Sequence, residues 1–133
     1  MEPPMNADEH RIALDRITKE IISCGFKVSN TLGCGFLEKV YENALVLELR
    51  KAGLKTDQQH GIAVHYVGTV VGEYAADLLV EGKVIVELKT VKTLDDVHLA
   101  QCMNYLKATG LSVCLLVNFG KPKLEVKRVV QDF

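Results

Sequence analysis

Two apolar runs separated by a short turn constrain the fold of this chain more than any other feature. The runs LLV and VIV flank Glu81–Lys83, and the charged residues Asp77, Glu87 and Lys89 stand at their outer ends. β-Branched runs around a short turn that contains glycine are typical of a β-hairpin. The sequence therefore predicts two neighbouring antiparallel strands that carry two acids and one lysine.

The length of the turn decides whether the two acids share a face of the sheet. A three-residue loop with Gly82 in the left-handed conformation puts Asp77 on the face of Glu87. A two-residue loop puts it on the opposite face, because a shift of one residue reverses every side chain. We predict the three-residue loop. Lys89 then shares this face with Glu87, since strand residues two apart point the same way.

Two acids at close quarters are costly unless a cation lies between them. Carboxylate oxygens are hard ligands that suit Mg²⁺ or Mn²⁺, so Asp77 and Glu87 are a candidate site for one of these ions. The alternative is that they are solvated charges on the exposed face of an antiparallel sheet.

Composition limits the classes of protein. The chain has 133 residues, of which 48% are apolar, and this suits one globular domain. We expect a disordered tail at residues 1–6 and a single domain at residues 7–133. A net charge of −1 excludes an overall basic field, so any affinity for nucleic acid has to come from a local patch. No apolar run is long enough to cross a membrane and no signal peptide is visible, so we expect a cytoplasmic protein with no membrane partner.

The cysteines form no C-x-x-C pair, which argues against a zinc or iron–sulfur site. Each lies among apolar residues, and free buried thiols are the simplest state in a reduced cytoplasm. The four residues concerned are Cys24, Cys34, Cys102 and Cys114.

Apolar residues at helical spacing predict three helices. The first begins at the cap Asn6 and runs to about Cys24 or a little beyond. The second runs from Phe36 to about Ala52. Its expected inner face consists of Leu37, Val40, Ala44 and Leu47.

The third helix is expected to begin at the cap Thr93 and to end at Gly110. It carries a polar stripe, His98, Gln101 and Tyr105, whose spacing of three and then four residues puts these side chains on one face. A solvated stripe more often consists of lysine and glutamate, so this one favours a lined cleft.

Strands are expected at residues 62–67, at 70–80 leading into the central hairpin, at 112–119 and at 124–130. The third of these runs is apolar throughout, as in a strand that is buried on both faces. A strand, a helix and a second strand at this spacing imply a parallel crossover. The predicted class is α/β (α+β), with a mixed central sheet made of an antiparallel β-meander and a parallel βαβ crossover, and with helices on both faces.

Three motifs now stand in order along the chain. Gly35 to Tyr41 reads G-x-x-E-x-x-Y with Glu38 at its centre, Asp77 is followed by Glu87-Leu88-Lys89, and Gln101 precedes Tyr105 by four residues. The chain resembles the PD-(D/E)XK nuclease superfamily from about Leu14 to Val130, and more closely the family named for its GxxExxY motif. This resemblance implies a restriction-endonuclease-like core.

The sequence departs from that family at two positions. Ala75 stands where the family usually has an arginine able to bind phosphate, and Cys34 stands where a proline is usual between the two glycines. The acidic and lysine positions of the motifs are all intact.

The resemblance also implies a role for each motif residue. Asp77 and Glu87 would bind Mg²⁺ (or Mn²⁺), with the Leu88 carbonyl as a further ligand and Glu38 acting through water. Lys89 would hold the attacking water and stabilise the transition state. Gln101 would orient a water or the phosphate, and Tyr105 would support the site.

A metal-dependent nuclease that hydrolyses phosphodiester bonds in nucleic acid follows from these roles. A chain this short has little surface left for reading bases, so we expect DNA recognised by its shape or ends, with a possible homodimer meeting two strands. The alternative is a catalytically inactive nuclease-like module that binds nucleic acid or a protein partner.

Overall fold

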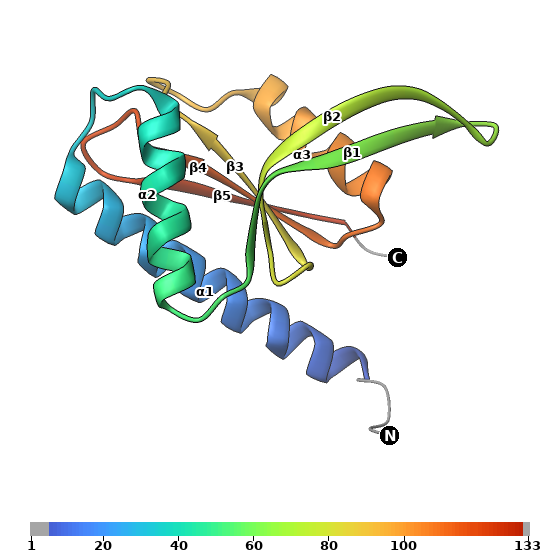
Figure 1. Ribbon diagram of the computed structural model, residues 1–133, viewed down its shortest axis with the longest axis horizontal. Helices are drawn as coiled ribbons and strands as arrows, with labels where there is room; N and C mark the ends of the chain where they lie inside the picture. The colour runs from blue at the N-terminus through green and yellow to red at the C-terminus, as the bar shows by residue number, and fades with distance from the viewer. Residues whose placement is uncertain (1–5, 132–133) are drawn as a thin grey trace.

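A computed structural model describes residues 6–131 and shows one five-stranded sheet with helices on both faces (Figure 1). In chain order the elements are α1 (Ala7–Leu32), α2 (Glu38–Lys51), β1 (Thr56–Tyr66), β2 (Thr69–Val80), β3 (Val84–Lys89), α3 (Asp96–Thr109), β4 (Val113–Asn118) and β5 (Glu125–Val130).

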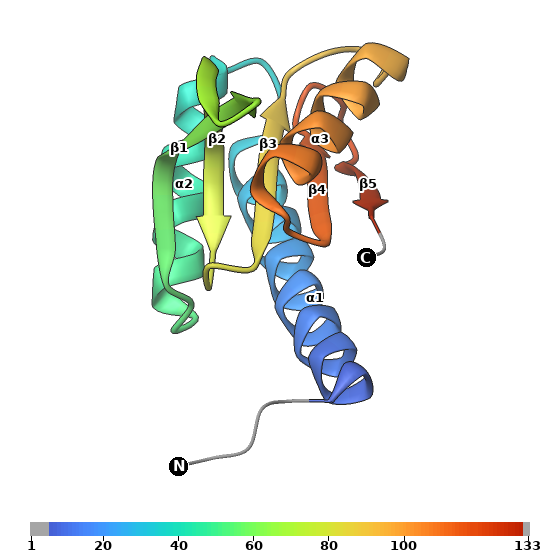
Figure 2. The same ribbon diagram turned by 90° about the vertical axis from the view of Figure 1, so that its right-hand side faces the viewer.

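The strands lie in the order β1-β2-β3-β4-β5, and only the β3–β4 pair is parallel. α3 connects these two strands and lies in front of them in Figure 2, whereas α1 and α2 lie behind the sheet. The predicted class is confirmed: an antiparallel meander is followed by a parallel crossover, with helices on both faces.

Two apolar layers hold the sheet between its helices. One layer joins the sheet to α1 and α2 through residues such as Ile21, Leu45 and Leu88, and the other joins it to α3 through Leu106 and Leu116. β3 and β4 are buried along almost their whole length, as expected for strands covered on both faces.

The first helix is longer than predicted. Asn6 caps it, with its side chain accepting a hydrogen bond from the Glu9 amide at 2.8 Å, but the helix continues past Gly25 to Leu32. A Cβ on Gly25 would lie 3.0 Å from a methyl carbon of Leu124. This glycine therefore lets the chain before β5 pack closely on the helix rather than ending it. The predicted tail, residues 1–6, lies outside the described residues apart from Asn6, and the division into tail and domain stays a prediction.

The inner face expected for the second helix is wrong. Leu37 and Leu47 are exposed, and the helix buries Tyr41, Leu45 and Leu49 instead. The middle of this helix is apolar on nearly every side, so periodicity alone does not single out one face. The true face turns two acids toward the sheet, Glu38 in the first turn and Glu42 one turn later.

Two further expectations fail locally. Asp95, not Thr93, caps α3, because its side chain accepts from the Val97 and His98 amides while His98 bonds back to the Asp95 amide. Cys34 is exposed, whereas the other three cysteines are free and buried as predicted.

No helix among residues 6–131 is long and apolar enough to span a membrane.

The loop that follows β3 is fixed by the end of β4. The buried Asn118 side chain donates to the Val91 carbonyl at 2.8 Å and accepts from the Val91 amide at 3.0 Å. The Phe119 amide donates to the Lys89 carbonyl at 2.8 Å. The direction in which the chain leaves Lys89 is therefore set by the Asn118-Phe119-Gly120 turn.

Gly120 should not tolerate a side chain, because a Cβ there would lie 2.5 Å from the backbone nitrogen and oxygen of Val91. We expect Gly120→Ala to lower the free energy of unfolding in urea by about 2–3 kcal/mol. Gly61→Ala is the control, since nothing lies within 4 Å of its added Cβ, and its effect should stay within about 0.5 kcal/mol. Equal effects of the two substitutions would contradict this account.

Candidate functional site

The candidate site begins where β2 and β3 part. Their ladder pairs Leu78 with Val86 and ends there, and the three-residue turn and its left-handed Gly82 are as predicted. Beyond the ladder the Asp77 amide donates to Glu87 Oε1 at 3.0 Å, and the Leu88 amide donates to Asp77 Oδ2 at 2.8 Å. Each carboxylate thus takes the place of a backbone carbonyl on the facing strand, which brings the two acids together as predicted.

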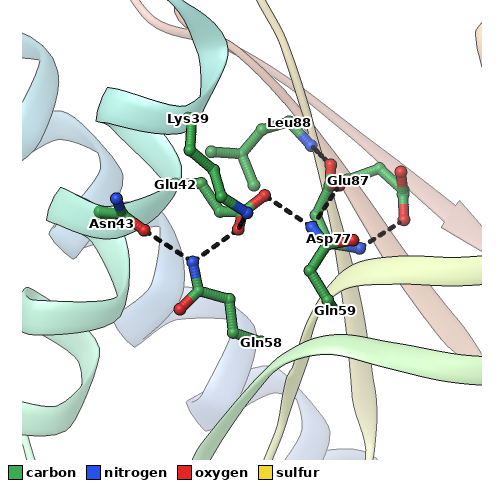
Figure 3. Close-up of polar contacts among 8 residues, drawn as sticks. All are labelled: Lys39, Glu42, Asn43, Gln58, Gln59, Asp77, Glu87 and Leu88. Carbon is green, nitrogen blue, oxygen red and sulfur yellow. Dashed lines mark hydrogen bonds and ion pairs between the residues drawn. The ribbon is translucent and has the colours of Figure 1, made fainter.

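A second polar network connects α2 to this pair (Figure 3). Glu42 is only 2% exposed, and its carboxylate accepts from Lys39 at 2.7 Å, Gln58 at 2.6 Å and Gln59 at 2.9 Å. The same Gln59 amide nitrogen reaches Asp77 Oδ1 at 3.4 Å. These three donors satisfy the buried charge of Glu42. The Glu42 carboxylate in turn holds the Gln59 side chain against Asp77.

The backbone of Gln59 explains how its side chain reaches the site. Its φ is +53°, an uncommon value for a residue other than glycine, and it is left out of the pairing between Gln58–Leu78 and His60–Ala76. The irregularity redirects the side chain toward Asp77. A strained residue at this position is consistent with a constraint imposed by the site.

Lys89 belongs to a third group of contacts, on the α3 side of the sheet. Its Nζ donates to Gln101 Oε1 at 3.4 Å, and Gln101 Nε2 donates to the Tyr105 hydroxyl at 3.1 Å. The polar stripe expected on this helix therefore reaches the motif lysine through Gln101. His98 does not take part, because it closes the capping box of α3.

Burial and like charge both act on the acids. Glu87 is 3% exposed, and this burial, together with the charge of Asp77, raises its pKa to about 9. Burial and the same Asp77 charge raise the pKa of Glu38, although Lys89 opposes the shift. Burial and the charge of Glu87 raise the pKa of Tyr105 to about 12. The charges of three motif residues, Asp77, Glu87 and Lys89, thus act on neighbouring groups in one region.

The arrangement offers ligands for an ion without forming a complete protein cage. Among the described residues, no group of three or more His, Cys, Asp and Glu side chains is close enough to hold a metal. Mg²⁺ usually takes only one or two carboxylates and completes its shell with water and substrate phosphate. Two carboxyl groups held side by side fit such an ion, because a cation between them removes the repulsion.

Sequence reasoning missed Glu42, Gln58 and Gln59. Glu42 lies one turn after Glu38 on the same helix face. Its place at the site therefore follows once the inner face of α2 is known. Gln59 gives no signal, since its role depends on an irregular backbone. Tyr41 of the G-x-x-E-x-x-Y motif has a structural role, because it is buried on Phe119 and its hydroxyl donates to the Gly33 carbonyl at 2.7 Å.

The comparison with known families gives the class. A model of the PD-(D/E)XK nuclease superfamily matches residues 15–129, which includes every motif residue described above. The chain belongs to the PD-(D/E)XK nuclease superfamily. Members of this superfamily generally use divalent metal ions.

One solved structure supports the fold. The protein SSO0001 is similar with a TM-score of 0.57 and 15% identity, over 93% of this chain and 63% of SSO0001; this chain therefore spans less than two thirds of that protein. The alkaline exonuclease LHK-Exo from Laribacter hongkongensis gives a TM-score of 0.47 and 13% identity, over 81% of this chain and 76% of the exonuclease. No curated protein matches the chain.

The raised pKa of Glu87 predicts an unusual dependence of stability on pH. The folded protein keeps a proton that the unfolded chain releases near the ordinary value of 4.5, so stability is lost as the pH rises from there toward about 9. Between about pH 5 and pH 8 we expect a loss on the order of 3 kcal/mol without metal, measured by urea unfolding. Added Mg²⁺ or Mn²⁺ should reduce this loss, because the ion stabilises the ionised acid.

Glu87→Gln tests the source of this slope. Glutamine keeps an oxygen for the Asp77 amide but cannot ionise, so the loss of stability between the two pH values should largely disappear. The control is Glu73→Gln, at an exposed residue of β2, which should keep the slope of the unaltered protein. An unchanged slope in Glu87→Gln would show that another group causes it.

Proposed function

We propose that this protein is a metal-dependent nuclease that hydrolyses phosphodiester bonds in nucleic acid. The observation that carries the proposal is the pair Asp77–Glu87 at the fork of β2 and β3, with Lys89 following on the same strand. The two carboxylates provide ligands for a cation, and the Lys89 amine provides a positive group for a phosphate.

Asp77 and Glu87 would hold the ion, each through the carboxylate oxygen that does not accept a strand amide. The Leu88 carbonyl and, through water, Glu38 would complete the protein ligands. When bound, Mg²⁺ or Mn²⁺ lowers the pKa of a water molecule and offsets the negative charge of the phosphate. The amides that bind the other two oxygens keep both carboxylates oriented before an ion arrives.

Lys89 would contribute the fixed positive charge of the site. Its ammonium group can donate to the attacking water or to a phosphate oxygen and stabilise the charge that develops there. Gln101 holds this group from α3 at 3.4 Å and would orient a water or the phosphate. Tyr105 holds Gln101 in turn, and with its raised pKa it stays a neutral donor at ordinary pH.

The same proposal includes the narrower features expected from the sequence. These are membership of the GxxExxY family, a preference for DNA shape or ends, a homodimer and a cytoplasmic location. The match of Gly35, Glu38 and Tyr41 to that motif supports the first of them. Size exclusion with light scattering tests the dimer directly.

Cleavage of labelled branched and linear DNA, and of RNA, in Mg²⁺ or Mn²⁺ tests the enzyme proposal. We expect Asp77→Asn and Lys89→Ala to slow cleavage by at least about a hundredfold, because each removes a ligand or a charge used in the transition state. Asp57→Asn on β1 and Lys83→Ala in the hairpin turn are matched controls outside the site and should retain full activity. If all four variants and the unaltered protein behave alike on every substrate, the proposal fails.

An inactive module remains the second candidate, favoured by one observation. Ala75, where a phosphate-binding arginine is usual in the GxxExxY family, is exposed on β2 and supplies no charge. A module of this kind would bind nucleic acid or a protein without cleaving nucleic acid in any divalent ion. DNA affinity that is equal in the unaltered protein and in Lys89→Ala, without cleavage, would support it.

A further inference from the structure

A groove separates α3 from the ribbon formed by the outer parts of β1 and β2. The ribbon projects beyond the rest of the sheet on the α3 side (Figures 1 and 2). The groove has a volume of about 830 Å³, within the range of pockets that take small molecules. Its ribbon wall includes His65 and Tyr74, and its helix wall includes Gln101, Asn104 and Tyr105.

This groove is continuous with the candidate site through two shared residues. Gln101 and Tyr105 line the groove, and Gln101 also contacts Lys89. A chain of nucleotides whose phosphate lay at Lys89 could therefore extend into the groove without leaving the protein surface. Lys107 also lines the groove. It provides a second positive group on α3, more than one helical turn beyond Gln101.

An aromatic side chain stands in the groove with its ring accessible. Tyr74 is 56% exposed, whereas Tyr105 is 6% exposed, and their ring centroids are 5.9 Å apart at a tilt of 51°. The buried ring supports the exposed one from the helix side. Exposed aromatic rings of this kind are stacking platforms for unpaired bases, and the neighbouring Asn104 and Gln101 amides can bond to base edges.

We propose that this groove binds unpaired nucleotides of the substrate, with a base stacked on Tyr74, and that the protein therefore acts on single strands, flaps or frayed ends rather than on continuous duplex. The proposal rests on the proposed function, because it assigns a substrate class to the same site. In a duplex the faces of the bases are covered by their neighbours, so a base can stack on Tyr74 only where it is unpaired.

The charge of the chain favours this class of ligand over duplex. The net charge is −1, and the lysine of the groove wall, Lys107, stands alone there among mostly neutral residues. Duplex binding without base contacts depends on several lysine or arginine contacts to phosphates. Stacking needs fewer of them, since it contributes affinity through the ring itself.

Fluorescence anisotropy in EDTA tests the proposal without cleavage. The probes are a labelled oligothymidine and the same strand annealed to oligodeoxyadenosine. We expect the single strand to bind at least tenfold more tightly than the duplex. Tyr74→Ala should weaken single-strand binding by roughly tenfold, and Tyr74→Leu should weaken it similarly, because leucine keeps apolar bulk but lacks a ring.

Tyr66→Ala is the matched control, since Tyr66 is 72% exposed at the end of the same ribbon and does not line the groove. It should bind as the unaltered protein does. Equal affinity for single strand and duplex, or equal effects of the Tyr74 and Tyr66 substitutions, would overturn the proposal. Thermal unfolding checks that all variants are folded, and the leucine variant replaces the alanine variant if that one is not.

The assay separates this proposal from the nuclease proposal. Binding of the single strand that depends on Tyr74 supports the groove even if no cleavage is found in any divalent ion. Suppose that cleavage depends on Asp77, but Tyr74→Ala binds and cleaves as the unaltered protein does. The nuclease proposal then stands and the groove proposal fails. Failure of the unaltered protein to bind either probe overturns the groove as a nucleotide site.

Discussion

The exchange of backbone amides between two carboxylates is the interaction on which the candidate site depends. Asp77 and Glu87 each accept the amide that an ordinary ladder would give to a carbonyl. These bonds connect the two strands beyond Leu78 and Val86, where the backbone ladder between β2 and β3 ends. The cost is a buried carboxyl group beside a second acid, and it is expressed in the raised pKa of Glu87. The rest of the site can be understood as support for that pair: Glu42 and Gln59 from one side, Lys89 from the other.

The sequence was sufficient for the part of this arrangement that follows from regular geometry. The period of two along a strand and the three-residue turn put Asp77, Glu87 and Lys89 together, because register determines the face of every side chain. The continuous apolar run of β4 likewise predicted a strand buried on both faces, and it is one. These features depend on local patterns that have one solution.

Other features depend on contacts between distant segments, which local patterns do not contain. The second helix has apolar residues on nearly every side, so only packing against Phe119 selects Tyr41 as its inner face. The first helix continues through Gly25 to Leu32, and the missing side chain of this glycine leaves room for Leu124. Gln59 reaches Asp77 through a backbone conformation that no propensity scale favours for glutamine. In each case tertiary packing overrides the intrinsic preference of the residue.

The chain of contacts from Glu42 through Gln59 to Asp77 has a consequence for how this protein can change. Gln59 is shared between a helix carboxylate at 2.9 Å and a strand carboxylate at 3.4 Å, so neither neighbour can be altered independently of the other. Substitutions at Glu42 and Asp77 should therefore be non-additive although the helix residue touches no substrate. During evolution this geometry would be kept most easily by replacing Glu42 and Asp77 together. Substitutions on α2 would then accompany substitutions in the site.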